Sequence, residues 1–268
     1  MGDVDDLPRL IAEAYRWQRR LGATPIATPY CGIVAAPQRP DVWDSNHADE
    51  VVAQTDAEAD VVFAAMDQHL SHTRWRVIHT DCFTPDAFLA RLAFDDFREC
   101  FVTIQMALRG DLTQRGAPVQ LRPVVDDADW EVLLRLVLAN HAEGRSSADL
   151  KLPPEFSKQM VATYRAKTGS YHFEVVIEDG APIAYGGHAA APNGVGMIED
   201  LFTLPSARRR GVATGMIAAL VDRLRAKGSR TIFLGALAAE QPKRLYARLG
   251  FRPVTLASAW VREGPVSR

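Results

Sequence analysis

Residues 198–215 read Ile-Glu-Asp-Leu-Phe-Thr-Leu-Pro-Ser-Ala-Arg-Arg-Arg-Gly-Val-Ala-Thr-Gly, and the rest of the chain is interpreted outward from them. They continue a predicted strand over Val195–Leu204 into a basic turn of small residues, after which apolar positions recur at helical spacing. The first N–H groups of a helix are unpaired and lie at the positive end of its dipole, so such a turn is suited to hold phosphate. A solvated basic turn without a ligand is the plain alternative.

Predicted elements flank this stretch in the order β-α-α-β-β-β-α-β-α-β. Asp179-Gly180 marks a hairpin between the second and third strands of that order, and Gly228 is placed to end the helix that follows the basic turn. The fold class expected is therefore α+β, a mixed sheet in which antiparallel hairpins come first and a crossover helix later joins two strands. The elements expected besides those named above are strands 119–124, 171–178, 182–191, 231–236 and 253–262, and helices from 126 to about 141, from 153 to about 167 and over 242–249.

A second motif follows the strand predicted over 231–236. Residues 245–251 read Leu-Tyr-Ala-Arg-Leu-Gly-Phe, and with them the chain resembles the GCN5-related N-acetyltransferase (GNAT) superfamily. Residues 208–213 match the family's Q/R-x-x-G-x-G/A loop, and 198–203 are close to the I-E-D-L-F-V strand of many small-amine acetyltransferases. The three motifs occur in the family's order, and the resemblance covers about residues 117–268.

The resemblance implies a GNAT acyl-CoA N-acyltransferase fold and acetyl-CoA as the cosubstrate, with no metal. It implies that the pantetheine arm pairs with the backbone of three strand residues and that the loop and helix start bind the pyrophosphate. The backbone N–H of the first of these strand residues would polarise the thioester carbonyl. The expected acetyl-CoA contacts are Leu201, Phe202, Thr203, Arg208, Arg209, Arg210, Gly211, Val212, Ala213 and Thr214.

The expected catalytic residues are Glu199, Asp200 and Tyr246. An amine must be neutral to attack, and a lysine-like amine has a pKa near ~10.4, so a base must take its proton. Glu199 fits this role; a bulge in the strand would instead reorient Asp200, so the choice between the two is open. Either carboxylate could simply bind a cationic acceptor. Tyr246 is placed to protonate the departing thiolate, with a packed aromatic as the alternative.

The N-terminal half, residues 1–115, is interpreted as a degenerate GNAT-like domain without a CoA site, and residues 116–268 as the GNAT domain. Residues 88–94 echo 245–251, as in tandem GNAT proteins. Where the first half should carry a phosphate loop, Asp56-Ala57-Glu58-Ala59-Asp60 places three carboxylates that would repel pyrophosphate. We expect this half to cover the sheet edge and to form one wall of the acceptor site. An unrelated α+β domain is the alternative.

Composition and cysteine usage limit the function classes. The 268 residues include 31 Lys+Arg and 33 Asp+Glu, so the net charge of −2 makes no case for nucleic acid as a partner. Apolar runs such as Met216–Val221 are far short of the ~18 residues of a membrane span. Three scattered cysteines argue against a disulfide framework and a zinc site. Without a signal-like N-terminus, a cytoplasmic location is expected.

The acceptor is expected to be a primary amine of a small molecule or peptide. The resemblance places the acceptor site around the loop 140–152, with Ser146, Ser147 and Asp149, but this segment does not indicate a particular amine. Another acyl donor, an oxygen acceptor and an aminoacyl-transferring tandem relative are alternatives among enzymes. A non-catalytic CoA-binding sensor or interaction protein is the alternative from another class. The oligomeric state is open, with a homodimer as one option.

Overall fold

The computed structural model describes residues 6–143 and 152–265. The C-terminal half follows the predicted order, which confirms the mixed sheet expected from the sequence. Asp179 and Gly180 both have positive φ, 49° and 76°, as the hairpin turn requires. The elements of this half are β6 (Gln120–Pro123), α4 (Asp127–Glu143), α5 (Pro154–Ala166), β7 (His172–Glu178), β8 (Ala181–Ala190), β9 (Val195–Thr203), the short 3₁₀ helix η3 (Pro205–Ala207), α6 (Val212–Ala226), β10 (Thr231–Leu237), α7 (Pro242–Leu249) and β11 (Arg252–Glu263).

In the N-terminal half the sequence pattern predicts strands over 30–37, 46–53, 74–80 and 99–108 and helices from about 57 to 70 and from 85 to 93, and the structure has an element at each place. It also has a helix and a strand near the start of the chain that were not predicted. These are the first helix, α1 (Leu7–Arg20), and the first strand, β1 (Thr24–Ala27). The other elements are β2 (Gly32–Ala35), the 3₁₀ helix η2 (Trp43–Ser45), β3 (His47–Asp49), α2 (Asp56–His69), β4 (Trp75–Thr80), α3 (Asp86–Phe94) and β5 (Arg98–Leu108). Within the described residues, no helix is both long and apolar enough to cross a membrane.

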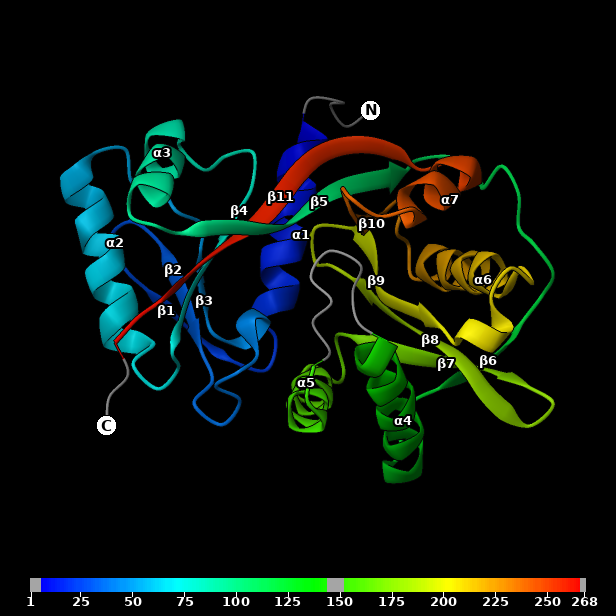
Figure 1. The fold of residues 1–268 in the computed structure, drawn as a ribbon. Coiled ribbons are helices and arrows are strands. Elements are labelled where there is room, and N and C mark those ends of the chain that lie inside the picture. Colours follow the sequence, from blue (N-terminus) through cyan, green and yellow to red (C-terminus); the bar gives the residue numbers. More distant parts are fainter. Residues whose placement is uncertain (1–5, 144–151, 266–268) are drawn as a thin grey trace.

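The two halves exchange strands within one sheet. The described strands follow the order β1-β2-β3-β4-β11-β5-β10-β9-β8-β7-β6. Thus β5, from the N-terminal half, pairs with β10, while β11, from the C-terminal half, pairs with β4, and the two exchanged strands pair with each other. Figure 1 shows both strands crossing between the two lobes. The units β4-α3-β5 and β10-α7-β11 are thereby equivalent in topology, and each half completes the sheet of the other.

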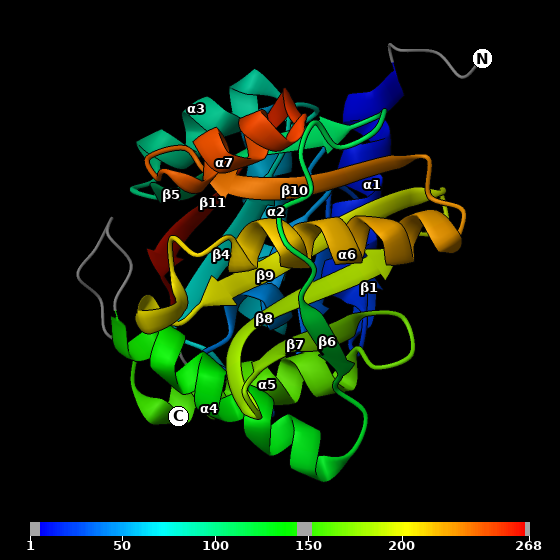
Figure 2. The ribbon, with the colours of Figure 1, turned by 90° about the vertical axis from the view of Figure 1, so that its right-hand side faces the viewer.

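Helices cover both faces of the sheet. Apolar residues of α1, α4 and α5 pack on one face of β7–β9, in a core that includes Ile11, Trp130 and Phe173. The opposite face is covered by α6 and α7, where Met216 and Leu249 are fully buried. In Figure 2, α6 crosses in front of β8 and β9. A separate core lies under α2 and α3 in the N-terminal lobe. Because α1 packs on the C-terminal lobe, side chains of the N-terminal half reach the centre of the sheet.

The linker between the halves packs against the start of α6. A Cβ on Gly215 would lie 2.3 Å from the carbonyl oxygen of Ala117, and a Cβ on Gly116 would lie 2.9 Å from Cγ2 of Thr214. Such contacts are too short for any side chain at Gly215. The glycine therefore allows the linker backbone to lie directly on the first turn of the helix.

Candidate active site

The candidate site begins where β9 and β10 separate. Their parallel pairing runs from Val195–Thr231 to Ile198–Leu234 and ends there. On the other side, the register with β8 shifts between Phe202–Tyr185 and Glu199–Gly187, which is a β-bulge. Asp200 in the bulge has φ of 54°, a conformation that Asp tolerates better than most residues. The backbone of Leu201–Thr203 on the side of β10 therefore lies beyond the end of the β9–β10 pairing. An extended ligand can form hydrogen bonds with it there.

Glu199 lies at the point of separation. Its Oε1 accepts a hydrogen bond from the backbone N–H of Gly235, 3.1 Å away on β10. Burial, and then the negative charge of the neighbouring Asp200, raise the pKa of Glu199 to about 8 even though the hydrogen bond from the Gly235 N–H lowers it. A carboxylate with a pKa near neutrality can take a proton and release it again, which is the property of a general base.

Asp200 is held on the opposite side of the bulge by two tyrosines. The hydroxyl of Tyr164 donates to Oδ1 at 2.9 Å, and that of Tyr171 donates to Oδ2 at 2.8 Å. Burial raises the pKa of Asp200, while these two hydrogen bonds lower it. Both carboxylate oxygens of Asp200 therefore accept hydrogen bonds, one from a residue of α5 and one from the residue before β7. The bulge thus gives Asp200 and Glu199 different surroundings, which the sequence alone could not distinguish.

Tyr246 lies on α7 and is 7% exposed. Burial raises the pKa of its hydroxyl above the usual value, and the negative charges of Glu199 and Glu240 raise it further. The phenol therefore stays protonated at neutral pH and can donate a proton. Its ring also packs against Phe251, with centroids 6.4 Å apart, so the aromatic has a packing role as well.

The basic turn leads into α6. Gly211 precedes the helix with φ of 84°, and a Cβ at this position would have no heavy atom within 4 Å, so the space beside it is open. Arg209 also has a positive φ, 60°. Residues Val212, Ala213 and Thr214 form the first turn of α6, whose N–H groups lack partners within the helix. This geometry can receive a phosphate group.

Two arginines of the turn are already paired with carboxylates. Both terminal nitrogens of Arg208 donate to Glu143, each at 2.5 Å, and its Nε donates to the carbonyl of Thr203 at 2.9 Å. Arg210 donates to Glu178 at 2.7 Å. An anion at this turn would therefore compete with these carboxylates for the guanidinium groups.

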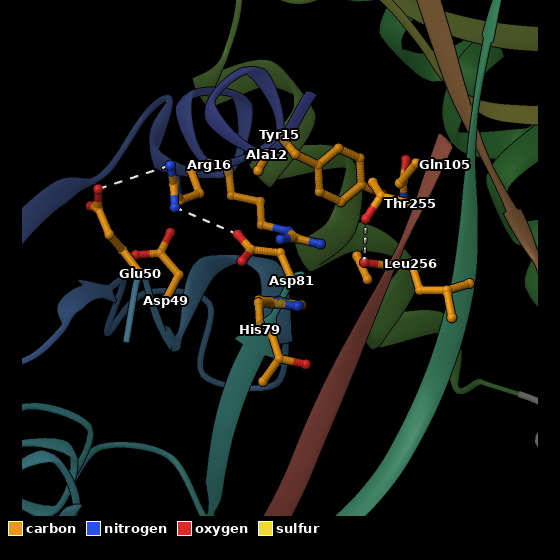
Figure 3. Close-up of a pocket in the computed structure, with 13 residues that line it drawn as sticks. Ala12, Tyr15, Arg16, Asp49, Glu50, His79, Asp81, Gln105, Thr255 and Leu256 are labelled. Atoms are coloured by element: carbon orange, nitrogen blue, oxygen red, sulfur yellow. Dashed lines mark hydrogen bonds and ion pairs between the residues drawn. The ribbon is translucent and has the colours of Figure 1, made fainter. Parts of the chain in front are cut away.

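A pocket borders this site on the side of the N-terminal half, and the sequence analysis missed the residues that line it. Figure 3 shows Tyr15 of α1 with its ring toward Gln105 and Thr255, while Arg16 lies toward Asp81 and Glu50. Burial raises the pKa of Tyr15, and Glu199 raises it further because the two residues are close. The apolar spacing of Leu7, Leu10, Ile11 and Ala14 could have indicated α1; no sequence signal marks Gln105 on β5. The pocket residues are Ala12, Tyr15, Arg16, Arg19, Asp49, Glu50, His79, Thr80, Asp81, Gln105, Thr255, Leu256 and Ala257.

Asp44 beside this pocket contacts the neutral ring of His79 and the guanidinium of Arg19. Asp44 lies 3.4 Å from Nε2 of His79 and 3.8 Å from Nε of Arg19. Burial lowers the pKa of His79 to about 3. Arg16 is only loosely paired, 3.5 Å from Asp81 and 4.0 Å from Glu50. The wall of the pocket thus carries charges of both signs. Ser146, Ser147 and Asp149, expected near the acceptor, lie outside the described residues.

In the part of the chain that the structure describes, no group of three or more His, Cys, Asp or Glu side chains is arranged to hold a metal ion.

Comparisons with known proteins agree with this geometry. The structure is similar over 96% of this chain and 96% of the other to a GCN5-related N-acetyltransferase from Kribbella flavida, at 17% identity and a TM-score of 0.70. A functionally unknown conserved protein from Staphylococcus epidermidis has 12% identity and a TM-score of 0.68, covering 90% of this chain and 94% of its own. A tandem GNAT protein from the clavulanic acid biosynthesis pathway has 12% identity and a TM-score of 0.58, with 99% and 97% covered. These likenesses show the fold.

Sequence similarity to a known family covers part of the C-terminal half. No curated protein sequence matches the chain significantly. Residues 138–251, which contain the bulge, the basic turn and α7, match the acetyltransferase (GNAT) family. This match supports an acyl-CoA-dependent acyltransferase. Residues 138–251 are thus similar in sequence to the GNAT family, and the chain shares its fold with GNAT structures over nearly its whole length.

Proposed function

We propose that the protein is an acetyl-CoA-dependent N-acetyltransferase that modifies a primary amine of a small molecule or peptide by direct attack in a ternary complex. The observation that carries the proposal is the open edge of β9 after Ile198, where the partly buried carboxylate of Glu199, with a pKa of about 8, interacts electrostatically with the buried, protonated Tyr246. A base and an acid are the two groups that amine acetylation requires.

The roles of these residues follow from the chemistry. Glu199 takes a proton from the acceptor ammonium, and the resulting amine attacks the thioester carbonyl carbon. The N–H of Leu201 stabilises the negative charge that develops on the carbonyl oxygen. A C–N bond then forms, the C–S bond breaks, and Tyr246 gives its proton to the departing thiolate. The newly bonded nitrogen loses its second proton as the amide forms, and this proton returns Tyr246 to its neutral form. Asp200, engaged by two hydroxyl groups, is assigned to orient the bulge rather than to move a proton.

The residues that would hold acetyl-CoA are those of the open edge and the basic turn. The edge of Leu201, Phe202 and Thr203 would pair with the pantetheine arm, and the turn and first helical residues, 208–214, would bind the pyrophosphate. The open space beside Gly211 and the unpaired N–H groups of α6 support this placement. Arg208 and Arg210 would move from Glu143 and Glu178 toward the phosphate oxygens, which accept charge-assisted bonds from a guanidinium as carboxylates do.

We propose further that residues 1–115 are a GNAT-like half without a CoA site and that 116–268 carry the chemistry. At the start of α2, Asp56 and Asp60 bind Arg91 and place negative charge where α6 has a basic turn. The strand exchange makes the two halves one folding unit. The N-terminal half would serve transfer by lining the acceptor side of the site, as the pocket of Figure 3 supports.

Substitution of Tyr246 by Phe tests the proposal. It removes the hydroxyl and keeps the ring that packs on Phe251, so we expect transfer to slow by about a hundredfold with little change in acetyl-CoA affinity. CoA release measures the transfer rate, and isothermal titration calorimetry measures the acetyl-CoA affinity. Unchanged turnover would refute the role of Tyr246. If the wild type binds acetyl-CoA but transfers the acetyl group to no amine, a CoA-binding sensor becomes the better interpretation. If it transfers faster from another acyl-CoA, that acyl-CoA replaces acetyl-CoA as the proposed donor.

A further inference from the structure

Gln105 brings an amide from the N-terminal half next to Glu199. It lies on the exchanged strand β5, directly opposite Gly235 of β10, and is 2% exposed. A Cβ on Gly235 would lie 3.1 Å from Oε1 of Glu199 and 3.5 Å from both Oε1 and Nε2 of Gln105. The two side chains therefore meet over the same glycine. Figure 3 shows Gln105 beside Thr255 at the end of the pocket occupied by the Tyr15 ring.

Thr103 fixes the orientation of this amide. Its hydroxyl donates to the carbonyl of Ala257 at 3.1 Å, and a hydroxyl has only one hydrogen to donate. Toward Gln105 it can therefore only accept, and Nε2 donates to it at 2.8 Å. The amide oxygen is thus directed away from Thr103. This buried Oε1 has no hydrogen-bond partner among the described residues.

An unpaired, buried amide oxygen is costly in the unliganded protein, and such groups require an explanation. The surroundings of Gln105 offer one. The amide oxygen of Gln105 can only accept hydrogen bonds, and it lies next to the carboxylate of Glu199, whose pKa is raised. A ligand with several N–H groups could bond to both. A primary ammonium has three, enough to bond to both side chains at once.

We propose that Oε1 of Gln105 accepts a hydrogen bond from the acceptor amine and holds it for attack. This inference rests on the proposed transferase function. The ammonium gives one proton to Glu199, a second N–H bonds to Gln105, and the nitrogen lone pair released by deprotonation forms the C–N bond as the C–S bond breaks. A primary amine meets this requirement, and the N-terminal half supplies one of its binding groups through the strand exchange.

The test compares Gln105→Leu with Gln114→Leu in the full-length protein. Ethanolamine, putrescine, lysine and tyramine serve as amine probes, with CoA release measured from acetyl-CoA. A hydrogen bond to a charged donor contributes enough to binding that we expect Gln105→Leu to raise KM for the best amine by about tenfold or more. Acetyl-CoA affinity should stay unchanged. Gln114→Leu makes the same change at an exposed position of the linker, away from the site, and should behave like the wild type.

Melting without ligands gives a second readout. Since Gln105→Leu removes an unpaired buried oxygen, we expect the melting temperature to stay the same or rise. A fall of about 4 °C or more would assign Gln105 a structural role and overturn the inference. An unchanged KM in a variant that still acetylates would also overturn it and leave the transferase function standing. If the wild type releases CoA with none of the four amines, the transferase proposal fails and the inference fails with it.

Discussion

Replacement of Glu199 by Gln should remove the pH dependence that the base imposes on transfer. The amide keeps the size of the side chain and an oxygen that can accept the Gly235 N–H, but it cannot take up a proton. Because burial raises the pKa of Glu199 to about 8, roughly half of the wild-type protein carries the ionised base at pH 8, and about one hundredth at pH 6.

The magnitude follows from these fractions. A positioned base contributes about 10²–10⁴-fold, so kcat of Glu199→Gln should fall by about that factor above pH 8. The ratio of kcat/KM between wild type and variant should then shrink roughly fiftyfold from pH 8 to pH 6. Ionisation of the free amine is the same in both reactions and cancels in the ratio.

The assay is CoA release from acetyl-CoA between pH 6 and 9 with the best amine. Glu155→Gln, on the exposed side of α5 where the Glu155 side chain is 69% accessible, is the matched control and should follow the wild-type profile. A ratio that does not vary with pH, or a variant with kcat within about twofold of the wild type, would refute the assignment of Glu199 as the base.

The same substitution has a consequence for stability. The pKa of Glu199 in the folded protein, about 8, lies above its ordinary value of 4.5, so between these two values the folded state binds the proton more tightly than the unfolded chain. Raising the pH through this window therefore costs stability. The glutamine side chain does not ionise, so Glu199→Gln does not lose this stability and should melt at a higher temperature than the wild type at pH 8.5. The difference in melting temperature should disappear near pH 4.5. Equal melting temperatures at both pH values would contradict the burial of the carboxylate.

Two further predictions concern the basic turn and the linker. Glu143→Gln should weaken the pairing that holds Arg208 and tighten acetyl-CoA binding by about threefold, most clearly at low salt; titration calorimetry measures this, and weaker binding would contradict a phosphate role for Arg208. Gly215→Ala should lower the melting temperature by about 4 °C or more, because the new Cβ would lie 2.3 Å from a linker carbonyl. Gly110→Ala, with no atom within 4 Å of its Cβ, is the control and should be neutral.

Much of the C-terminal half could be predicted because its signals are local. The hairpin at Asp179-Gly180 and the strand–turn–helix around Gly211 each depend on residues adjacent in the chain. The amphipathic helix α1 was missed although its apolar spacing is visible, and with it Tyr15 and Arg16 of the pocket.

Long-range pairing could not be predicted from local signals. The exchange of β5 and β11 joins strands far apart in the sequence, since each half alone offers the same strand pattern with or without exchange. The position of Gln105 over Gly235 follows from that pairing. The engagement of Asp200 by Tyr164 and Tyr171 likewise depends on a bulge whose direction neighbouring residues do not specify.

Acetyl-CoA titration followed by thermal unfolding tests the central claim most directly. At ~100 times its dissociation constant a ligand stabilises the folded state by roughly 2.7 kcal/mol, which corresponds to about 5–10 °C for a protein of this size. We expect this shift in the wild type and in Gly211→Asn, because Asn tolerates the positive φ of 84° and carries no charge. Gly211→Asp, of the same size but with a carboxylate facing the pyrophosphate, should lose it. No shift in the wild type, or equal shifts in all three proteins, would contradict acetyl-CoA binding at this turn.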